Sequence, residues 1–352
     1  MIYLGGCLDN IQIVADQWES RLHDFMFNER KNDLRIKGVK GTYDTYFDKM
    51  VGKVDNGVMR KSEKSIVLAE LYGFKEHFRE IVLAGEKELD EYSRKKVSNY
   101  MKKLMVKLYT DFTQDKDAKG ISNAHYFFRA LNLLTCPYCN RHYIFTLDKR
   151  ANLVSPEYDH FYDKSSHPLL AVSFYNLVPS CHTCNHVKGT KNTAKVNPYF
   201  SGFKSKFELQ DDKGEKRLSS EEILKRGGGR IGFDNMRKPR IENEKKTDEE
   251  TVDSEEPIIK ERGNVETFGL QGLYEMHSDY ISELVGKVIA YNPTVRQALV
   301  DAFQDQAYSP QQVYDFVWGR YLEEAQYRNR PLSKLTKDVL EQLGILPDDD
   351  FQ

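Results

Sequence analysis

The 352-residue chain is poor in cysteine, contains two tryptophans and carries almost no net charge. Its 52 Lys and Arg side chains nearly balance 54 Asp and Glu side chains, which leaves a formal net charge of −2. A balance of this size does not by itself indicate a polyanionic partner for the whole chain. Five cysteines are too few for the disulfide framework of a secreted domain, so we expect a reducing compartment.

Long hydrophobic runs are also missing from the sequence. No segment approaches the roughly 18 consecutive apolar residues that a membrane-spanning helix needs. The opening residues MIYLGG lack the basic lead and the long apolar run of a secretory signal. We therefore expect a cytoplasmic protein with no membrane partner, and the chain is long enough for two or three domains.

Both ends of the chain have the periodicity of helices. Residues 1–120 are predicted to form an N-terminal helical region, because apolar residues recur every three or four positions near 8–28, 58–82 and 87–112. Residues 267–352 are predicted to form a C-terminal helical region for the same reason. The two regions flank a segment of different character.

That middle segment, residues 121–200, is rich in histidine, asparagine and aromatic residues. Its eight Lys and Arg against four Asp and Glu give a local net charge of +4. Short β-like runs occur at 142–147 and 157–162, which predicts a compact α+β module. Residues 201–266 are predicted to be a charged, partly flexible connector, and their acidic stretch 242–256 has no aromatic residue.

Two Cys-x-x-Cys pairs lie at the two ends of one insert. Cys136 and Cys139 form the first pair, Cys181 and Cys184 form the second, and 41 residues (140–180) separate them. Four thiolates suit one tetrahedral Zn²⁺, and a site with four cysteine ligands is structural because no position is left for water. The alternative, four cysteines without a metal, remains open. The sequence therefore predicts a structural zinc that joins the ends of the insert.

The insert and the residues just after it hold side chains that a zinc site does not need. Hydrolysis of a phosphodiester requires an activated water and a cation beside the phosphate and the leaving oxygen. His160 can act as the base, while the Asp159 carboxylate and the Asn185 amide oxygen suit Mg²⁺ or Mn²⁺. Adjacent strand residues point to opposite faces. Asp159 and His160 can therefore share a site only at a kink or at the edge of a strand.

The order of these residues resembles the zinc-knuckle HNH endonuclease motif with its ββα-metal fold. The resemblance covers about 75 of the 352 residues. It implies a mainly α chain with a small α+β module, in which an HNH core stapled by a four-cysteine zinc lies between two helical regions. The sequence elements that carry the resemblance are Cys136-x-x-Cys139, Glu157-Tyr-Asp-His160, Asn176 and Cys181-x-x-Cys184-Asn185.

The same resemblance assigns roles to individual residues. His160 is the general base, Asn176 orients the hairpin and the base, and Asp159 and Asn185 are ligands of the catalytic metal. The residues expected to contact phosphate or DNA are Lys188, Lys191 and His186. Where the motif's third letter is a histidine, this chain has Asn185 with His186 beside it. The asparagine variant is common in active relatives, and His186 would be the ligand only if the helix were rotated by about one residue.

A narrower resemblance concerns three short sequence segments, residues 159–164, 174–180 and 330–337. They are similar to those of bacterial HNH proteins of anti-phage defence, such as the nuclease subunit of Septu-type systems, which works with an ATPase partner. This resemblance implies a defence nuclease with a possible ATPase subunit. DNA is the expected substrate, because a single-metal site that stabilises the leaving oxygen does not require a 2′-OH.

A second hypothesis is a non-catalytic, zinc-dependent module that binds nucleic acid or protein. RING-like adaptors also use paired Cys-x-x-Cys knuckles. Such a module has no need for the Asp159-His160 pair or for Asn185 directly after the last cysteine. These residues favour the enzyme.

Overall fold

The computed structural model describes seven ranges of the chain: 2–28, 45–149, 152–154, 156–191, 195–237, 252–304 and 308–346. Within them the chain is mainly helical, and its strands form three two-stranded antiparallel sheets. The predicted class, mainly α with a small β portion, is confirmed at that level. None of the helices described is long and apolar enough to cross a membrane.

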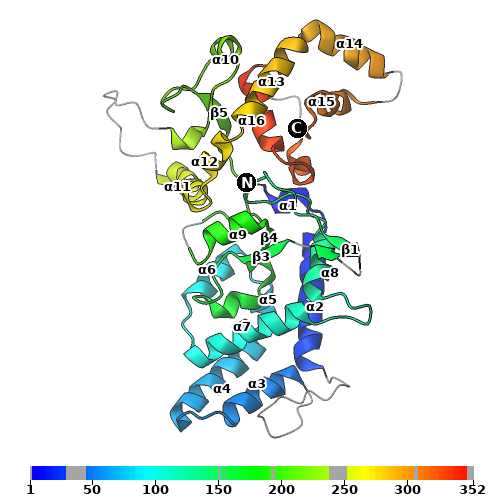
Figure 1. Cartoon of the computed structure of the whole chain (residues 1–352). Helices are drawn as coiled ribbons and strands as arrows, with labels where there is room; N and C mark the ends of the chain where they lie inside the picture. The colour runs from blue at the N-terminus through cyan, green and yellow to red at the C-terminus, as the bar shows by residue number, and fades with distance from the viewer. Residues whose placement is uncertain are drawn as a thin grey trace. The chain divides into compact units, whose positions relative to one another are not determined.

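The chain divides into two compact units (Figure 1). Unit 1 comprises Met1–Cys7, Leu133–Phe145 and Cys181–Gln352, and unit 2 comprises Leu8–Asn132 and Thr146–Ser180. Each unit is therefore built from segments that are not consecutive in the sequence. The two cysteine pairs belong to unit 1, and the segment of Asp159, His160 and Asn176 belongs to unit 2.

Unit 2 contains most of the predicted N-terminal helical region together with the paired strands of the insert. Its helices are α2 (Ile11–Phe27), α3 (Tyr46–Asp55), α4 (Lys61–Glu76), α5 (Phe78–Val82), α6 (Glu86–Arg94), α7 (Asn99–Gln114), α8 (Asn123–Leu131), η1 (Pro168–Val172) and η2 (Phe174–Asn176). Its strands are β1 (Leu147–Lys149), β2 (Asn152–Val154), β3 (Glu157–His160) and β4 (Leu177–Ser180).

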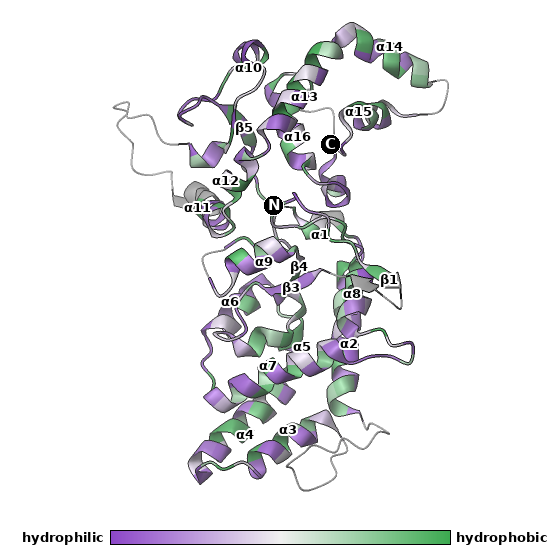
Figure 2. Cartoon of the chain, in the orientation of Figure 1, coloured by the Kyte–Doolittle hydropathy of each residue, from purple (hydrophilic) through white to green (hydrophobic). Residues whose placement is uncertain are grey.

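The predicted helices near 58–82 and 87–112 are each divided into two. In the second case α7 starts anew at Ser98, whose hydroxyl accepts a hydrogen bond from the Met101 amide at 3.1 Å. Figure 2 shows hydrophobic and hydrophilic residues mixed along α3, α4 and α7, as expected for helices that bury one face. The buried side chains of α7 include Leu104, Leu108 and Phe112.

The core of unit 2 is built around Trp18 of α2, which is 1 % exposed. Its ring lies edge-on to Phe112 of α7 and to Phe127 of α8, with centroids 5.0 and 4.7 Å away. The indole Nε1 donates a hydrogen bond to the Val172 carbonyl of η1 at 2.9 Å. Tyr158 of β3 also meets this ring, at 6.0 Å. The aromatic core therefore holds both β3 and η1 in place.

Strands β3 and β4 form an antiparallel hairpin around the insert's functional candidates. Asp159 is opposite Val178, and His160 is opposite Leu177. All of β4 is buried. The predicted run 157–162 is thus a strand as far as His160, after which the chain turns away.

Unit 1 joins the cysteine pairs to the predicted C-terminal helical region. Its elements are α1 (Leu4–Cys7), α9 (His182–Lys188), β5 (Phe207–Gln210), α10 (Ser220–Arg226), β6 (Arg230–Phe233), η3 (Asp234–Met236), α11 (Val252–Thr267), α12 (Leu270–Glu275), α13 (Ser278–Ala290), α14 (Pro293–Gln304), α15 (Pro310–Trp318), η4 (Glu324–Asn329) and α16 (Ser333–Gln342). Strands β5 and β6 pair with each other, and α16 packs against β5.

The side chain of Gln342 fastens α16 to β5. Its Oε1 accepts from the Leu209 amide at 2.7 Å, and its Nε2 donates to the Leu209 carbonyl at 3.0 Å. Residues 201–266, predicted to be a connector, contain β5, α10, β6 and the larger part of α11. The acidic stretch 242–256 lies outside the described residues as far as residue 251, and its last five residues belong to α11.

The predicted strand at 142–147 is wrong for most of its length. Only Tyr143 takes part in an isolated bridge, with Thr135, and strand β1 begins at Leu147. The β pairing of this segment is limited to that one bridge, which two backbone hydrogen bonds form. The Cys136 amide donates to the His142 carbonyl, and the Ile144 amide donates to the Leu134 carbonyl, both at 2.9 Å.

Candidate functional site

The four cysteines of unit 1 come together as predicted. Their Sγ atoms all lie within 4.8 Å of one another, and all four side chains are buried. Zn²⁺ with four thiolate ligands at about 2.3 Å needs sulfur atoms just under 4 Å apart. Burial raises the pKa of the Cys136 thiol, so thiolates here need a cation beside them. The group can therefore hold a metal ion such as zinc, and no coordination position is left for a substrate.

Backbone geometry prepares each pair for a metal. The Arg141 amide points at Cys139 Sγ and the Cys184 amide points at Cys181 Sγ, each at 3.4 Å. Cys181 is also the residue that caps α9. Amide hydrogens directed at sulfur stabilise the thiolate form, so both pairs favour metal binding.

Asn140 connects the first pair to the C-terminal part of unit 1. It has a left-handed φ of 46°, which asparagine tolerates better than most residues, and it is 1 % exposed. Its Nδ2 donates to the Tyr327 carbonyl at 3.0 Å, and its carbonyl accepts from the Leu332 amide. Tyr274 adds a hydrogen bond from its hydroxyl to the Cys139 carbonyl at 2.5 Å. The cysteine group thus lies in the core of unit 1.

In unit 2, Asn176 closes the loop between β3 and β4. Its Oδ1 accepts from the Tyr162 amide at 2.7 Å, while its Nδ2 donates to the carbonyls of Tyr162 and Leu170 at 3.0 and 2.9 Å. The side chain is fully buried. Three hydrogen bonds to backbone, each worth about 1 kcal/mol net, hold the hairpin loop in one conformation.

The same loop sets the orientation of His160. Its Nε2 lies 3.0 Å from the carbonyl oxygen of Ala171 in η1. A carbonyl can only accept a hydrogen bond, so Nε2 carries the hydrogen and Nδ1 holds the lone pair of the neutral ring. The ring is 7 % exposed. His160 is therefore held in the tautomer whose Nδ1 can take a proton.

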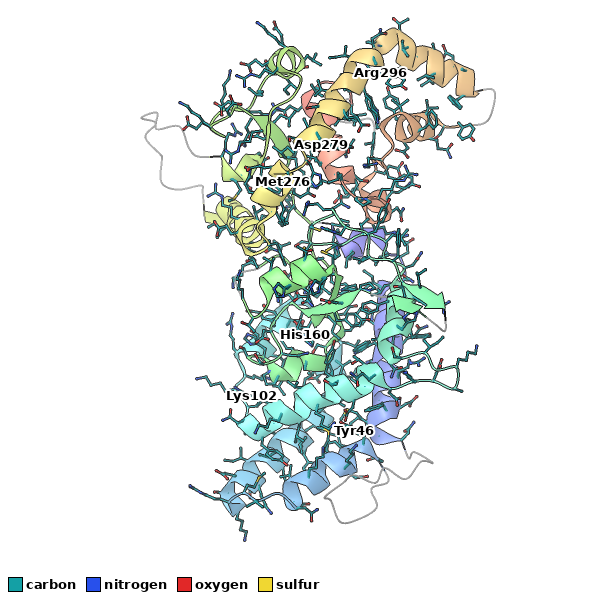
Figure 3. All side chains as sticks on the ribbon, viewed as in Figure 1. Tyr46, Lys102, His160, Met276, Asp279 and Arg296 are labelled. Atoms are coloured by element: carbon teal, nitrogen blue, oxygen red, sulfur yellow. The ribbon has the colours of Figure 1, made fainter. Side chains whose placement is uncertain are left out.

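Tyr109 of α7 meets both members of the Asp159-His160 pair. The rings of Tyr109 and His160 are edge-to-face, with centroids 4.5 Å apart (His160 is labelled in Figure 3). Burial, and then the negative charge of Asp159, raise the pKa of the Tyr109 hydroxyl. His160 is the last residue of β3, and the chain turns away after it. The kink or strand edge that a shared site of Asp159 and His160 requires stays a prediction.

Lys164 lies on the same tyrosine. Its Nζ is 4.6 Å from the centroid of the Tyr109 ring, a cation–π distance. Burial lowers the pKa of this ammonium group, and the Asp163 carboxylate opposes the shift. A half-buried cation close to the Asp159-His160 pair can contact a phosphate oxygen.

The sequence did not indicate Tyr109 as a site residue. Lys164 was indicated only as the last residue of segment 159–164, which resembles bacterial HNH proteins. Tyr109 precedes His160 by 51 positions (109 to 160), on a helix that shows nothing more than amphipathic periodicity. No local signal could have found it. Lys164 follows the Asp159-His160 pair closely, so its proximity to the pair was a usable signal.

The remaining predicted residues belong to α9 and its end, in unit 1. Asn185 is half-buried, His186 and Lys191 are exposed, and Lys188 is buried at 1 % exposure. The rings of His182 and His186 stack with centroids 5.8 Å apart, as residues one helical turn apart should. In chain order β3, β4 and α9 follow one another as strand, strand and helix.

Comparison with known protein families, curated proteins and solved structures yields no match to this chain. Its function must therefore be inferred from its own residues.

Proposed function

We propose that this protein is a metal-dependent endonuclease of the HNH type that hydrolyses DNA phosphodiester bonds. The observation that carries the proposal is the held tautomer of His160: Nε2 faces the Ala171 carbonyl at 3.0 Å. A base that must remove a proton from water needs a lone pair at a defined position, and Nδ1 supplies one. Asn176 keeps the loop that carries His160 and Ala171 closed.

Each residue has a separate task in this reaction. His160 takes the proton of the attacking water at Nδ1 and then holds it. The sequence resemblance, rather than a measured distance, assigns Asp159 and Asn185 as the ligands of Mg²⁺ or Mn²⁺, an ion that would neutralise the scissile phosphate and the leaving 3′ oxygen. His186 and Lys191 of unit 1, which are exposed, are the proposed phosphate or DNA contacts, whereas Lys188, expected from the sequence to be a third, is 1 % exposed and offers no surface to DNA. The cysteine group would hold a Zn²⁺ that takes no part in the reaction, because four thiolates would complete its coordination.

A plasmid-cleavage assay tests this proposal. Supercoiled plasmid is incubated with the purified chain in Mg²⁺, Mn²⁺, added Zn²⁺ or EDTA, and nicked and linear products are separated on a gel. We expect cleavage with Mg²⁺ or Mn²⁺, none with EDTA, and none with the His160→Ala variant. Cleavage that persists in His160→Ala at the wild-type rate would show that His160 is not the base.

DNA binding should rest on phosphate contacts rather than on base reading. Among the described residues, the elements present no tandem-finger arrangement, and residues 121–200 carry a net charge of +4. Binding through phosphates falls steeply with salt, by about 10³–10⁵ between 50 and 200 mM for six to ten contacts. Equal affinity at low and physiological salt would contradict this part of the proposal.

The second candidate is a zinc-dependent binding module without catalysis. The closed cysteine group and the basic charge of residues 121–200 favour this binding module. An oriented His160 would have no function in a protein that does not catalyse a reaction. Binding of DNA by the metal-loaded chain with no cleavage in any divalent metal would support this candidate.

A role in anti-phage defence with an ATPase partner rests on the narrower sequence resemblance. The protein would then be the nuclease subunit of a bacterial defence system. Size-exclusion chromatography of the chain with the product of a neighbouring ATPase gene tests this idea. Co-elution is expected, and a chain that elutes alone with every neighbour rules the partner out.

A further inference from the structure

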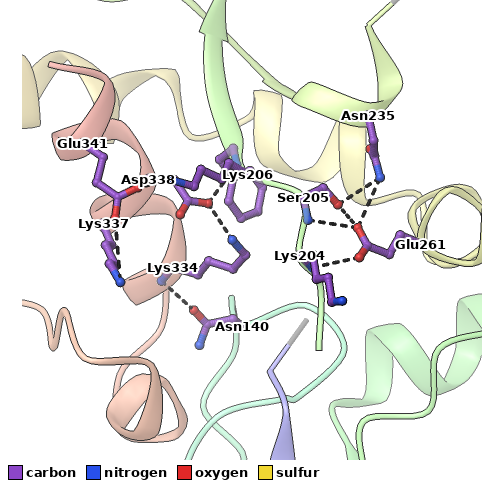
Figure 4. Close-up of polar contacts among 11 residues, drawn as sticks. Asn140, Lys204, Ser205, Lys206, Asn235, Glu261, Lys334, Lys337, Asp338 and Glu341 are labelled. Atoms are coloured by element: carbon purple, nitrogen blue, oxygen red, sulfur yellow. Dashed lines mark hydrogen bonds and ion pairs between the residues drawn. The ribbon is translucent and has the colours of Figure 1, made fainter. Parts of the chain in front are cut away.

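Unit 1 contains a cavity of about 580 Å³ between α16 and the chain that leads into β5 (Figure 4). A hydrogen bond of 2.8 Å from the Phe207 amide to Asp338 Oδ2 fixes the two sides of this cavity to each other. Most side chains in its wall come from residues 200–206 and from α16, and the others are Tyr3, Glu324 and Tyr327. We call it the lysine pocket.

Cations outnumber carboxylates in the wall of the lysine pocket. Four lysines face three carboxylates there, which leaves a net charge of +1 (4 − 3). The lysines are Lys204, Lys206, Lys334 and Lys337, and the carboxylates are Glu324, Asp338 and Glu341. A concave surface with a positive excess attracts an anion more strongly than an open surface does.

Ion pairs hold the lysines of α16 in place. Lys334 Nζ lies 2.7 Å from Asp338 Oδ2, and both residues are buried, at 7 and 5 % exposure. Glu341 lies between Lys206 at 2.8 Å and Lys337 at 3.7 Å. Asp338 also accepts from the Phe207 amide. Because these ion pairs hold the ammonium groups of Lys206, Lys334 and Lys337 at fixed positions, the groups are ordered before any ligand binds.

Aromatic rings line the same cavity. Tyr3 and Phe200 are half-buried and belong to its wall. Gly202 allows the chain to approach Tyr3, since a Cβ added there would lie 3.1 Å from the Tyr3 backbone nitrogen. The Leu4 amide donates to the Pro198 carbonyl at 2.7 Å, which holds this first segment against the loop. Aromatic side chains and ammonium groups in one cavity wall suit a ligand with a planar ring and a phosphate.

We propose that the lysine pocket binds a nucleotide unit, with the phosphate on Lys204 and Lys206 and the base against Tyr3 or Phe200. Either a free nucleotide or one residue of a nucleic-acid strand supplies this chemistry. Ammonium groups bind the charge of a phosphate as point donors. The pocket is composed of unit 1 residues alone, none of which is proposed to take part in cleavage.

Calorimetric titration of the zinc-loaded full chain, without added Mg²⁺ or Mn²⁺, tests the proposal. The probes are inorganic phosphate, AMP and a short oligodeoxynucleotide with a 5′-phosphate. We expect AMP to bind more tightly than inorganic phosphate, and the Lys204→Ala/Lys206→Ala double variant to bind it at least about tenfold more weakly, which is about 1.4 kcal/mol. Lys213→Ala changes an exposed lysine of unit 1 outside the pocket and should bind as the wild type does.

The competition pattern identifies the source of the ligand. An oligonucleotide that displaces AMP indicates a strand of nucleic acid, and one that does not indicates a free nucleotide. If no probe binds, or if the double variant binds AMP as the wild type does, the proposal is wrong. Lys204 and Lys206 are exposed, so unchanged thermal midpoints should show that the variant is folded. No cleavage is measured, so the result is separate from the fate of the nuclease proposal.

Discussion

The Nε2 atom of His160 lies 3.0 Å from the carbonyl oxygen of Ala171, so the imidazole is held in one tautomer by the backbone of η1. The bond links the last residue of β3 to a short 3₁₀ helix eleven residues further along the chain. A base on a flexible loop would lose this orientation.

Replacing His160 with alanine should reduce plasmid cleavage by about 10²–10⁴, the usual contribution of a general base. The zinc content should stay the same, because the cysteine group lies in unit 1. His142→Ala serves as the matched control, since that side chain is exposed and has no proposed role. Equal loss in both variants would contradict a specific role for His160.

Replacing Asn176 with alanine should lower the free energy of unfolding by about 3 kcal/mol, because buried backbone groups at Tyr162 and Leu170 lose their partners. Asn176→Asp should be destabilised most at neutral pH, where a carboxylate would face two carbonyls. Those carbonyls raise the pKa of the new carboxyl group, so stability should recover as the pH falls through that raised pKa.

Urea unfolding of these variants at pH 5 and pH 8 measures the effect. Asn99→Ala, at an exposed position in the first turn of α7, should change stability by no more than about 0.5 kcal/mol. A pH-independent loss in Asn176→Asp would argue against the hydrogen-bond pattern described.

Replacing Tyr109 with leucine should slow cleavage by about tenfold, because the His160 ring loses the edge-to-face contact that positions it. Tyr109→Phe keeps the ring and removes only the buried hydroxyl, so it should stay close to the wild-type rate. Single-turnover rates at saturating Mg²⁺ separate this effect from metal affinity. Equal rates for Tyr109→Leu and the wild type would remove Tyr109 from the site.

Replacing Cys136 with serine should abolish zinc binding and loosen unit 1. The purified wild-type chain should contain one zinc per molecule by elemental analysis, and the variant none. Limited proteolysis should then cut near residues 133–145 and 181–188, which the metal no longer holds together. Cys7→Ser changes the one cysteine of the sequence that belongs to neither Cys-x-x-Cys pair, and this variant should keep its zinc. A variant without zinc that resists protease like the wild type would contradict a structural role for the metal.

The stability of unit 2 should fall at alkaline pH, in part through Tyr162. Burial, and then the Asp90 carboxylate, raise the pKa of Tyr162 from its ordinary value of 10.0 to about 12. A folded-state pKa above the unfolded one gives stability that is complete below pH 10.0 and is lost as the pH rises through about 12. Tyr162→Phe should lose less stability than the wild type between pH 9 and pH 11 in urea unfolding. An identical loss in both proteins would show that Tyr162 contributes nothing.

Much of the local structure is encoded over short distances and could be predicted. The helices of both terminal regions follow from apolar spacing, and α15 follows from Ser309 and Pro310 at its start. The four cysteines were recognisable as a metal group because the chemistry of thiolates in Cys-x-x-Cys pairs is narrow. The strand predicted at 142–147 failed because the segment pairs with residues 134–136 through one bridge only, and β propensity does not supply a longer partner strand.

By itself, the sequence determined which groups can do chemistry: the cysteine tetrad, the Asp159-His160 pair and the asparagine between the knuckles. Residue type and spacing along the chain suffice for that, since ligand and base chemistry belong to single side chains. Only the tertiary structure decided the tautomer of His160, the three bonds of Asn176 and the place of Tyr109 beside the pair. These depend on contacts between segments far apart in the chain, which the packing around Trp18 brings together.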